Sequence, residues 1–178
     1  MRLGTSLLGL SGALGALWIA VIGCGEDRFA PTLTPTPLLT DDTAYVAFPS
    51  GVGQYRRYGF TLVAHYENRT TAPLYLDRCS SNSPSPIYGV QVVDGAGTAA
   101  YDPIWACGAG SPILVEAGAR RSDTLRIAGP NTWDGTGAPV GTLEGEFRLY
   151  YEVRTCANDV QCRSAVAPSN PFRVQLAR

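Results

Sequence analysis

The sequence contains no lysine and a single histidine, and these absences exclude several kinds of chemistry. All fourteen basic residues are arginine, so the chain has no lysine for a Schiff base or a phosphate-binding P-loop. Charged residues make up 16% of the 178 residues, well below the usual quarter. The net charge of −1 provides no basic surface for nucleic acid or anionic lipid, so we expect no nucleic-acid partner.

Motifs for catalysis are also scarce. Any nucleophile–histidine–acid triad would have to use His65, but this residue lies in an alternating segment, where a cross-strand contact on a sheet face is the simpler interpretation. The sequence has no G-x-S-x-G motif and no nucleotide-binding glycine loop in a suitable context. Glu144 and Glu146 are two residues apart, as on the charged outer face of a strand. We therefore predict no catalytic residue, no enzymatic activity and no cofactor.

The first 23 residues have the pattern of an export signal. Residues 1–2 supply one positive charge, and residues 3–23 form an uncharged run rich in Leu, Gly and Ala. The run is long enough to be an uncleaved anchor helix, which is the alternative. Its end, residues 21–24 (VIGC), resembles the lipobox of bacterial lipoproteins. That resemblance implies a signal peptide of residues 1–23, acylation of Cys24 (palmitate included) and attachment to the cell envelope. Gly25 in place of Asp favours the outer membrane.

The segment after Cys24 is rich in proline and threonine. Residues 24–43 include three Pro residues that alternate with Thr, a composition typical of an extended spacer with polyproline II character. We therefore expect a disordered tether over residues 24–43 and a folded domain over residues 44–178, with the membrane as a partner through the lipid.

The rest of the chain shows the period-2 alternation of β-strands. The clearest examples are residues 58–67 and 146–154, in which every second residue is apolar. The predicted inward side chains are Phe60, Leu62, Ala64 and Tyr66 in the first segment and Phe147, Leu149, Tyr151 and Val153 in the second. Shorter strands are expected at 73–76, 87–93, 113–116, 120–128 and 172–176, and residues 98–105 are expected to pair back on 87–93.

Strands of this number and spacing define the fold class. About seven to nine short strands separated by turn signals are typical of a β-sandwich. Two packed antiparallel sheets are the simplest way to bury the inner faces of such strands. We predict an all-β, immunoglobulin-like antiparallel β-sandwich, with a small closed barrel as the competing architecture.

Four cysteines remain after Cys24, an even number that indicates disulfides in an exported chain. Four cysteines permit three pairings. We favour Cys156–Cys162, which closes a short polar loop, and therefore Cys79–Cys107. Zinc ligands are usually more closely spaced than these cysteines, and the one histidine lies in mid-strand, so we expect no metal site.

Two tryptophan loops are the candidates for binding a partner. Trp105 follows Asp102 and Pro103, and Trp133 lies between Asn131 and Asp134, so each indole is set in a polar, Gly- and Pro-rich connection. Such loop aromatics can stack on sugars or anchor a protein. The alternatives are that Trp105 plugs the end of the sandwich and that Asp134 shapes a turn. Residues 68–70 (NRT) match the N-glycosylation pattern, which we discount in a bacterial chain.

The order of motifs over residues 58–154 resembles a known domain. A strand leads into an N-x-T motif (YGFTLVAHYENRT), and a second strand ends in a D-G turn (VQVVDGAG). After a Trp comes a strand pair joined by an A-G turn (ILVEAGARRSDTL), and G-x-F-R then begins the last long strand (LEGEFRLYYEV). This layout is similar to the BsuPI-type intracellular proteinase inhibitor domain, which implies a β-sandwich fold. The cysteines and export signal do not suit an intracellular inhibitor. We expect a lipid-anchored envelope protein with a non-enzymatic binding or structural module for a protein or glycan partner, with a protease-inhibitor-like module as the alternative.

Overall fold

The structure is a computed structural model that describes residues 37–95, 97–108, 110–157 and 162–178. The chain divides into two units, residues 1–30 and 31–178, and all described residues belong to the second. The predicted signal peptide and Cys24 therefore lie outside the described residues. Within the described part, no helix is long and apolar enough to cross a membrane.

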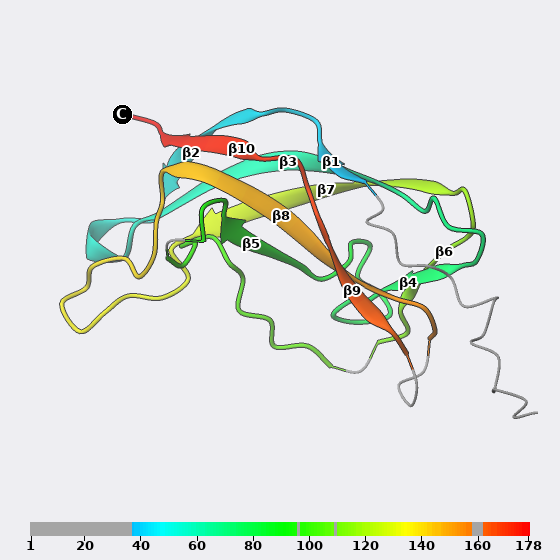
Figure 1. The fold of residues 1–178 in the computed structure, drawn as a ribbon. Helices are drawn as coiled ribbons and strands as arrows, with labels where there is room; N and C mark the ends of the chain where they lie inside the picture. The colour runs from blue at the N-terminus through cyan, green and yellow to red at the C-terminus, as the bar shows by residue number, and fades with distance from the viewer. Residues whose placement is uncertain (1–36, 96, 109, 158–161) are drawn as a thin grey trace, which may run out of the picture. The chain divides into compact units, whose positions relative to one another are not determined.

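The described residues form an all-β domain of ten strands with one short 3-10 helix, η1 (Gly53–Tyr55) (Figure 1). The predicted all-β class is thus confirmed. The strands are β1 (Leu38–Thr40), β2 (Ala44–Ser50), β3 (Arg57–Glu67), β4 (Leu74–Leu76), β5 (Tyr88–Val92), β6 (Ile113–Val115), β7 (Arg120–Gly129), β8 (Gly145–Arg154), β9 (Ser164–Pro168) and β10 (Phe172–Leu176).

The strands join in one mixed sheet, whereas the sequence led us to expect two separate antiparallel sheets. The order is β1-β3-β2-β10-β8-β4-β6, with β7 paired to β3 and with β5 and β9 paired to β8. The two halves are connected because β2 changes partner along its length. Residues 48–50 pair with β3, and residues 44–47 pair in parallel with β10. The change of partner along β2 could not be predicted, because the alternation of apolar and polar residues does not show which strand a segment pairs with.

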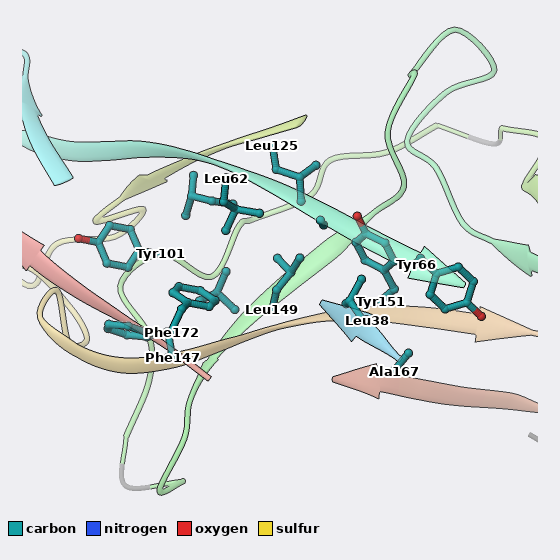
Figure 2. Close-up of a cluster of buried hydrophobic side chains, with 14 of the residues drawn as sticks. Leu38, Leu62, Tyr66, Tyr101, Leu125, Phe147, Leu149, Tyr151, Ala167 and Phe172 are labelled. Atoms are coloured by element: carbon teal, nitrogen blue, oxygen red, sulfur yellow. The ribbon is translucent and has the colours of Figure 1, made fainter. Parts of the chain in front are cut away.

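The two halves of the sheet face each other across an aromatic core (Figure 2). The predicted inward residues of β3 and β8 are all buried, as the alternation indicated. Rings from the two halves meet directly: the centroids of Tyr66 on β3 and Tyr151 on β8 are 6.2 Å apart. Phe172 on β10 lies 6.2 Å from Phe60 on β3. Burial of this apolar surface is the main stabilising contribution to the fold.

The folded domain begins earlier than the predicted boundary at residue 44. Leu38–Thr40, assigned above to the tether, forms β1 and pairs antiparallel with β3. The Leu38 side chain is fully buried. Thr40 exchanges hydrogen bonds with Asn170, whose Oδ1 accepts from the Thr40 backbone N–H at 2.8 Å. The proline-rich composition concealed a short strand because three residues are too few to show alternation.

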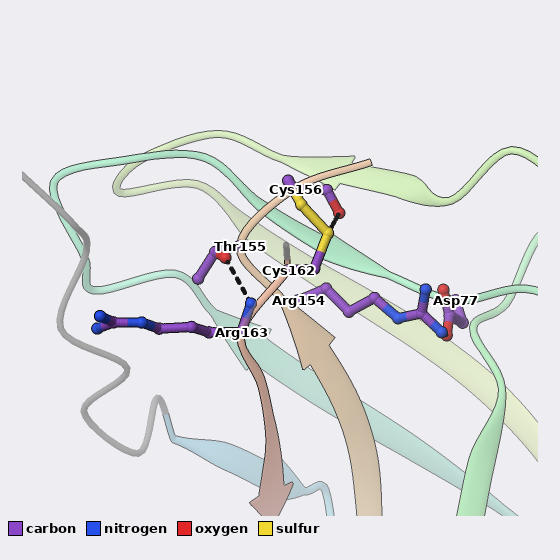
Figure 3. Close-up of a disulfide and its surroundings, with 6 residues drawn as sticks. All are labelled: Asp77, Arg154, Thr155, Cys156, Cys162 and Arg163. Carbon is purple, nitrogen blue, oxygen red and sulfur yellow. Dashed lines mark hydrogen bonds and ion pairs between the residues drawn. A yellow bond between two sulfur atoms is a disulfide. The ribbon is translucent and has the colours of Figure 1, made fainter. Parts of the chain in front are cut away.

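The two disulfides are the two that we predicted from the sequence. Cys79 is bonded to Cys107 and Cys156 to Cys162, with sequence separations of 28 and 6. The second disulfide closes the loop between the paired strands β8 and β9 (Figure 3). Arg154, at the end of β8, forms an ion pair of 2.7 Å with Asp77 beside this loop. The disulfide and the ion pair together stabilise the end of the β8–β9 hairpin at which the loop lies.

Candidate functional site: an aromatic and acidic pocket beside Trp105

A small pocket of about 100 Å³ lies beside strand β5. Among the named strands of the described residues, β5 pairs with β8 alone, so its other side is an edge. Three aromatic residues and two acidic residues line the pocket together with short or apolar residues. The lining residues are Ile87, Tyr88, Gly89, Asp102, Pro103, Trp105, Tyr150 and Glu152.

Side chains of the 102–107 loop cover the free edge of β5. Asp102 Oδ1 accepts a hydrogen bond of 2.8 Å from the Val90 backbone N–H, and the Trp105 indole N–H donates to the Tyr88 carbonyl at 2.8 Å. Pro103 has no N–H to give to a strand ladder. The expectation that residues 98–105 pair back as a strand was therefore wrong: residues 98–100 exchange backbone bonds with Thr142 instead. The loop nevertheless protects an otherwise open edge.

Trp105 is fixed in place while part of its ring stays accessible. Its ring is perpendicular to that of Tyr88, with centroids 5.2 Å apart. The residue is 40% exposed, so it is not a buried plug at the end of the domain. Because its N–H is already bonded to the chain, what Trp105 can offer a ligand is the π-face and the apolar edge of the indole.

Tyr150 packs against Gly89 in a way that requires glycine. The two residues are register partners in the β5–β8 pair. A Cβ atom at position 89 would lie 2.0 Å from Cζ of Tyr150, so any other residue would displace the ring. The sequence signal for this contact was a glycine inside a strand segment, which often marks a close approach. Sequence reasoning missed both Gly89 and Tyr150.

Negative charge gathers around the Tyr150 hydroxyl. Burial, and then the charges of Asp102 and Glu152, raise the pKa of Tyr150 above its ordinary value. No ion pair in the described part of the chain includes either carboxylate. The pocket thus combines aromatic rings with negative potential, and the groups that line it are suited to binding.

The other predicted binding residues do not line this pocket. Asn131 Nδ2 donates a hydrogen bond of 2.8 Å to the Asp102 carbonyl, and Asn131 Oδ1 accepts one from the Arg57 guanidinium. Asn131 therefore stabilises the start of the 102–107 loop without lining the pocket. The Asp134 carboxylate accepts from Thr136 and from the Ala138 N–H, bonds that lower the pKa of Asp134. These contacts show that Asp134 shapes its own turn.

Trp133 is part of a separate contact. Its ring meets that of Tyr55 edge-on, with centroids 5.5 Å apart, and its buried indole N–H has no hydrogen-bond partner among the residues that the structure describes. The described structure therefore brings Trp105 and Asn131 into one region and places Trp133 against η1.

His65 makes the cross-strand contact that the sequence suggested. His65 on β3 and Ser122 on β7 are register partners, and Nδ1 lies 2.8 Å from the Ser122 hydroxyl oxygen. Both line a groove of about 370 Å³ with Glu67. Arg69 and Arg120 hold the pKa of Glu67 below its usual range, at 3.0 and 3.1 Å from its carboxylate. Within the described ranges, no group of three His, Cys, Asp or Glu side chains could hold a metal ion.

No protein-family model matches the chain, and no curated protein is similar to it in sequence. The resemblance to the BsuPI-type inhibitor domain rests on the quoted motifs alone. The fold and geometry therefore define the protein as an all-β domain with two disulfides and an aromatic and acidic pocket.

Proposed function

We propose that the protein is a lipid-anchored component of the bacterial cell envelope whose β domain is a non-enzymatic binding module. The signal-like residues 1–23 and the lipobox-like residues 21–24 support the anchor at Cys24. Two disulfides support an oxidising compartment, since such bonds persist in exported proteins. Gly25 supports the outer membrane as the location. The partner is an envelope protein or glycan.

The pocket beside Trp105 is the observation that carries the binding role. Trp and Tyr dominate binding energy at protein interfaces because they bury large areas with little loss of conformational freedom. Trp105 is held by a hydrogen bond, a ring contact and the nearby Cys79–Cys107 disulfide. A preformed surface of this kind loses little entropy when a partner binds. Ile104, at 70% exposure, extends it toward solvent.

The envelope assignment is tested by the intact mass of the protein extracted from its native membrane. We expect a chain that begins at Cys24, carries acyl mass, and reacts with a thiol alkylating reagent only after reduction. An unprocessed chain that begins at Met1 would contradict the lipid anchor. Four free thiols before reduction would contradict export.

The binding role is tested by photo-cross-linking in the native envelope. A photoreactive amino acid at Ile104 is expected to give a discrete adduct that disappears when Trp105→Ala is added. The control position is Val52, which is 90% exposed and does not line the pocket. Equal labelling from both positions, or an adduct that is indifferent to Trp105, would show that the pocket is not the contact.

A further inference from the structure

We infer that the pocket beside Trp105 binds an alkylammonium group, such as the end of a partner's lysine side chain. This inference rests on the proposed binding role of the same pocket and names the chemistry that the pocket recognises. Its three elements are the size of the pocket, the arrangement of its rings and the placement of its carboxylates.

The size of the pocket limits the ligand to one chemical group. Sites for whole small molecules usually enclose about 300–1,000 Å³. At about 100 Å³, this pocket is too small for such a molecule or for a chain of sugars. It can hold the tip of a side chain or a small headgroup whose remainder lies outside.

The aromatic surface of the pocket favours a compact cation. Trp105 and Tyr150 both line it, and the Tyr150 ring lies across Gly89. The Tyr88 ring is on the core side of the sheet, because Tyr88 is the register partner of the buried Tyr151 and its hydroxyl donates to the Arg126 carbonyl on β7; it supports Trp105 through their ring contact. A guanidinium ion prefers to stack flat on a ring, whereas an ammonium group is more compact and can bring its positive charge against a π-face in a pocket of this size. An indole that has already donated its N–H keeps its face for this contact.

The carboxylates decide the charge of the ligand. Asp102 and Glu152 line the same pocket, and no cation of the described residues pairs with them. An anionic ligand would be repelled, and a neutral one would leave the two charges uncompensated. The chain has no lysine, so a side-chain ammonium group must come from another molecule.

The test is a titration of the oxidised full chain in maltoside micelles, followed by the NMR signal of the Trp105 indole N–H. Choline is compared with 3,3-dimethylbutan-1-ol, which has the same shape without the charge. We expect choline to shift the signal saturably and the neutral analogue to bind at least about fivefold more weakly, the factor that about 1 kcal/mol of cation–π attraction gives. Nα-acetyl-lysine methylamide then tests a protein side chain as the source. Equal binding of choline and its neutral analogue, or no shift with any cation, would overturn the inference.

Substitutions locate the effect in the pocket. Glu152→Gln and Asp102→Asn are each expected to weaken choline binding about two- to fivefold, as for exposed charge pairs. Glu146→Gln, on the same outward side of β8 but outside the pocket, is the matched control and should change nothing. Gly89→Ala should abolish binding by displacing Tyr150. Equal effects of Glu146→Gln and Glu152→Gln would count against the pocket.

The two proposals can fail separately. If cations do not bind but the adduct from Ile104 persists and needs Trp105, the pocket binds its partner through other chemistry. If choline binds but the adduct and the lipid mass are absent, the pocket is a cation site and the envelope role falls.

Discussion

Two regions of the domain place carboxylates beside tyrosine hydroxyls, and they differ in how the charge is balanced. In the core, Asp123 is 3% exposed, Arg121 pairs with both of its oxygens, and the Tyr151 hydroxyl donates to it at 3.2 Å. In the pocket, Asp102 and Glu152 lie near Tyr150, and no ion pair in the described part of the chain includes them.

The difference separates a structural role from a binding role. A buried charge without a partner costs several kcal/mol, so the core must supply its own cation. A carboxylate at the surface can rely on solvent and salt, so two of them can remain together without a partner from the chain. Arg121 therefore completes a structural network, whereas the pocket keeps charges that a ligand can use.

The largest expected effect is the loss of the buried ion pair. Arg121→Leu leaves Asp123 charged and buried, and we expect the free energy of unfolding to fall by about 3–5 kcal/mol. Chemical denaturation at neutral pH measures this loss. In the double variant Arg121→Leu/Asp123→Leu no charge remains, so most of the stability should return. A double variant as unstable as the single one would show that packing, and not the buried charge, dominates.

Asn68 is the next most sensitive position. Its side chain is fully buried, and Nδ2 donates to the carbonyls of Ala72, Val115 and Glu116. Asn68→Ala leaves these carbonyls without that donor, which should lower the free energy of unfolding by about 2–3 kcal/mol. Thr61→Ala, at an exposed position of the preceding strand β3, is the control and should change stability by less than about 0.5 kcal/mol. Equal effects would contradict the role of the amide.

The burial of Asn68 also bears on the glycosylation pattern at residues 68–70. In the folded domain its Nδ2 atom is enclosed and bonded, so it cannot accept a sugar there. The pattern N-R-T has a structural cause instead: Asn68 Oδ1 accepts from the N–H and the hydroxyl of Thr70, which turns the chain after β3.

Much of the fold could be predicted because strong alternation reports burial directly. Strands β3, β8 and β10 and their inward faces follow from period-2 patterns in long or aromatic segments. Strands β1, β2 and β9 were missed because they are short or contain proline, and their stability depends on partners far away in the sequence. The parallel pairing of β2 with β10 is an example, because it joins residues 44–47 to residues 173–176.

The candidate site was only partly predictable. Trp105 stood out as an aromatic residue in a proline-rich loop, but its neighbours could not be identified from the sequence. Tyr88 and Tyr150 look like ordinary strand residues, and Glu152 like an outward charge. They line the same pocket as Trp105 because β5 pairs with β8 and the 102–107 loop follows the free edge of β5. Register and loop path are tertiary properties.

Removal of charge at the pocket should have little effect on stability, in contrast to the core. In the variant Asp102→Asn/Glu152→Gln, the amide oxygen at position 102 can still accept from Val90. We expect the free energy of unfolding to change by less than about 0.5 kcal/mol, with any gain largest at low salt because a repulsion is relieved. Denaturation at two ionic strengths checks this. A loss comparable to that of Arg121→Leu would make the pocket carboxylates structural.

The smallest expected effect is a change in the ionisation of Tyr150. Its raised pKa means that the fold favours the neutral phenol, so this contribution to stability is complete below about pH 10 and is lost as the pH rises through the raised pKa. Glu152→Gln removes one of the negative charges that oppose ionisation, so the pKa of Tyr150 should fall toward its ordinary value. NMR of ¹³Cζ-labelled tyrosine, with the signal assigned by Tyr150→Phe, follows this titration. The fall should be absent in Glu146→Gln, and an unchanged pKa in Glu152→Gln would mean that this carboxylate does not act on the pocket.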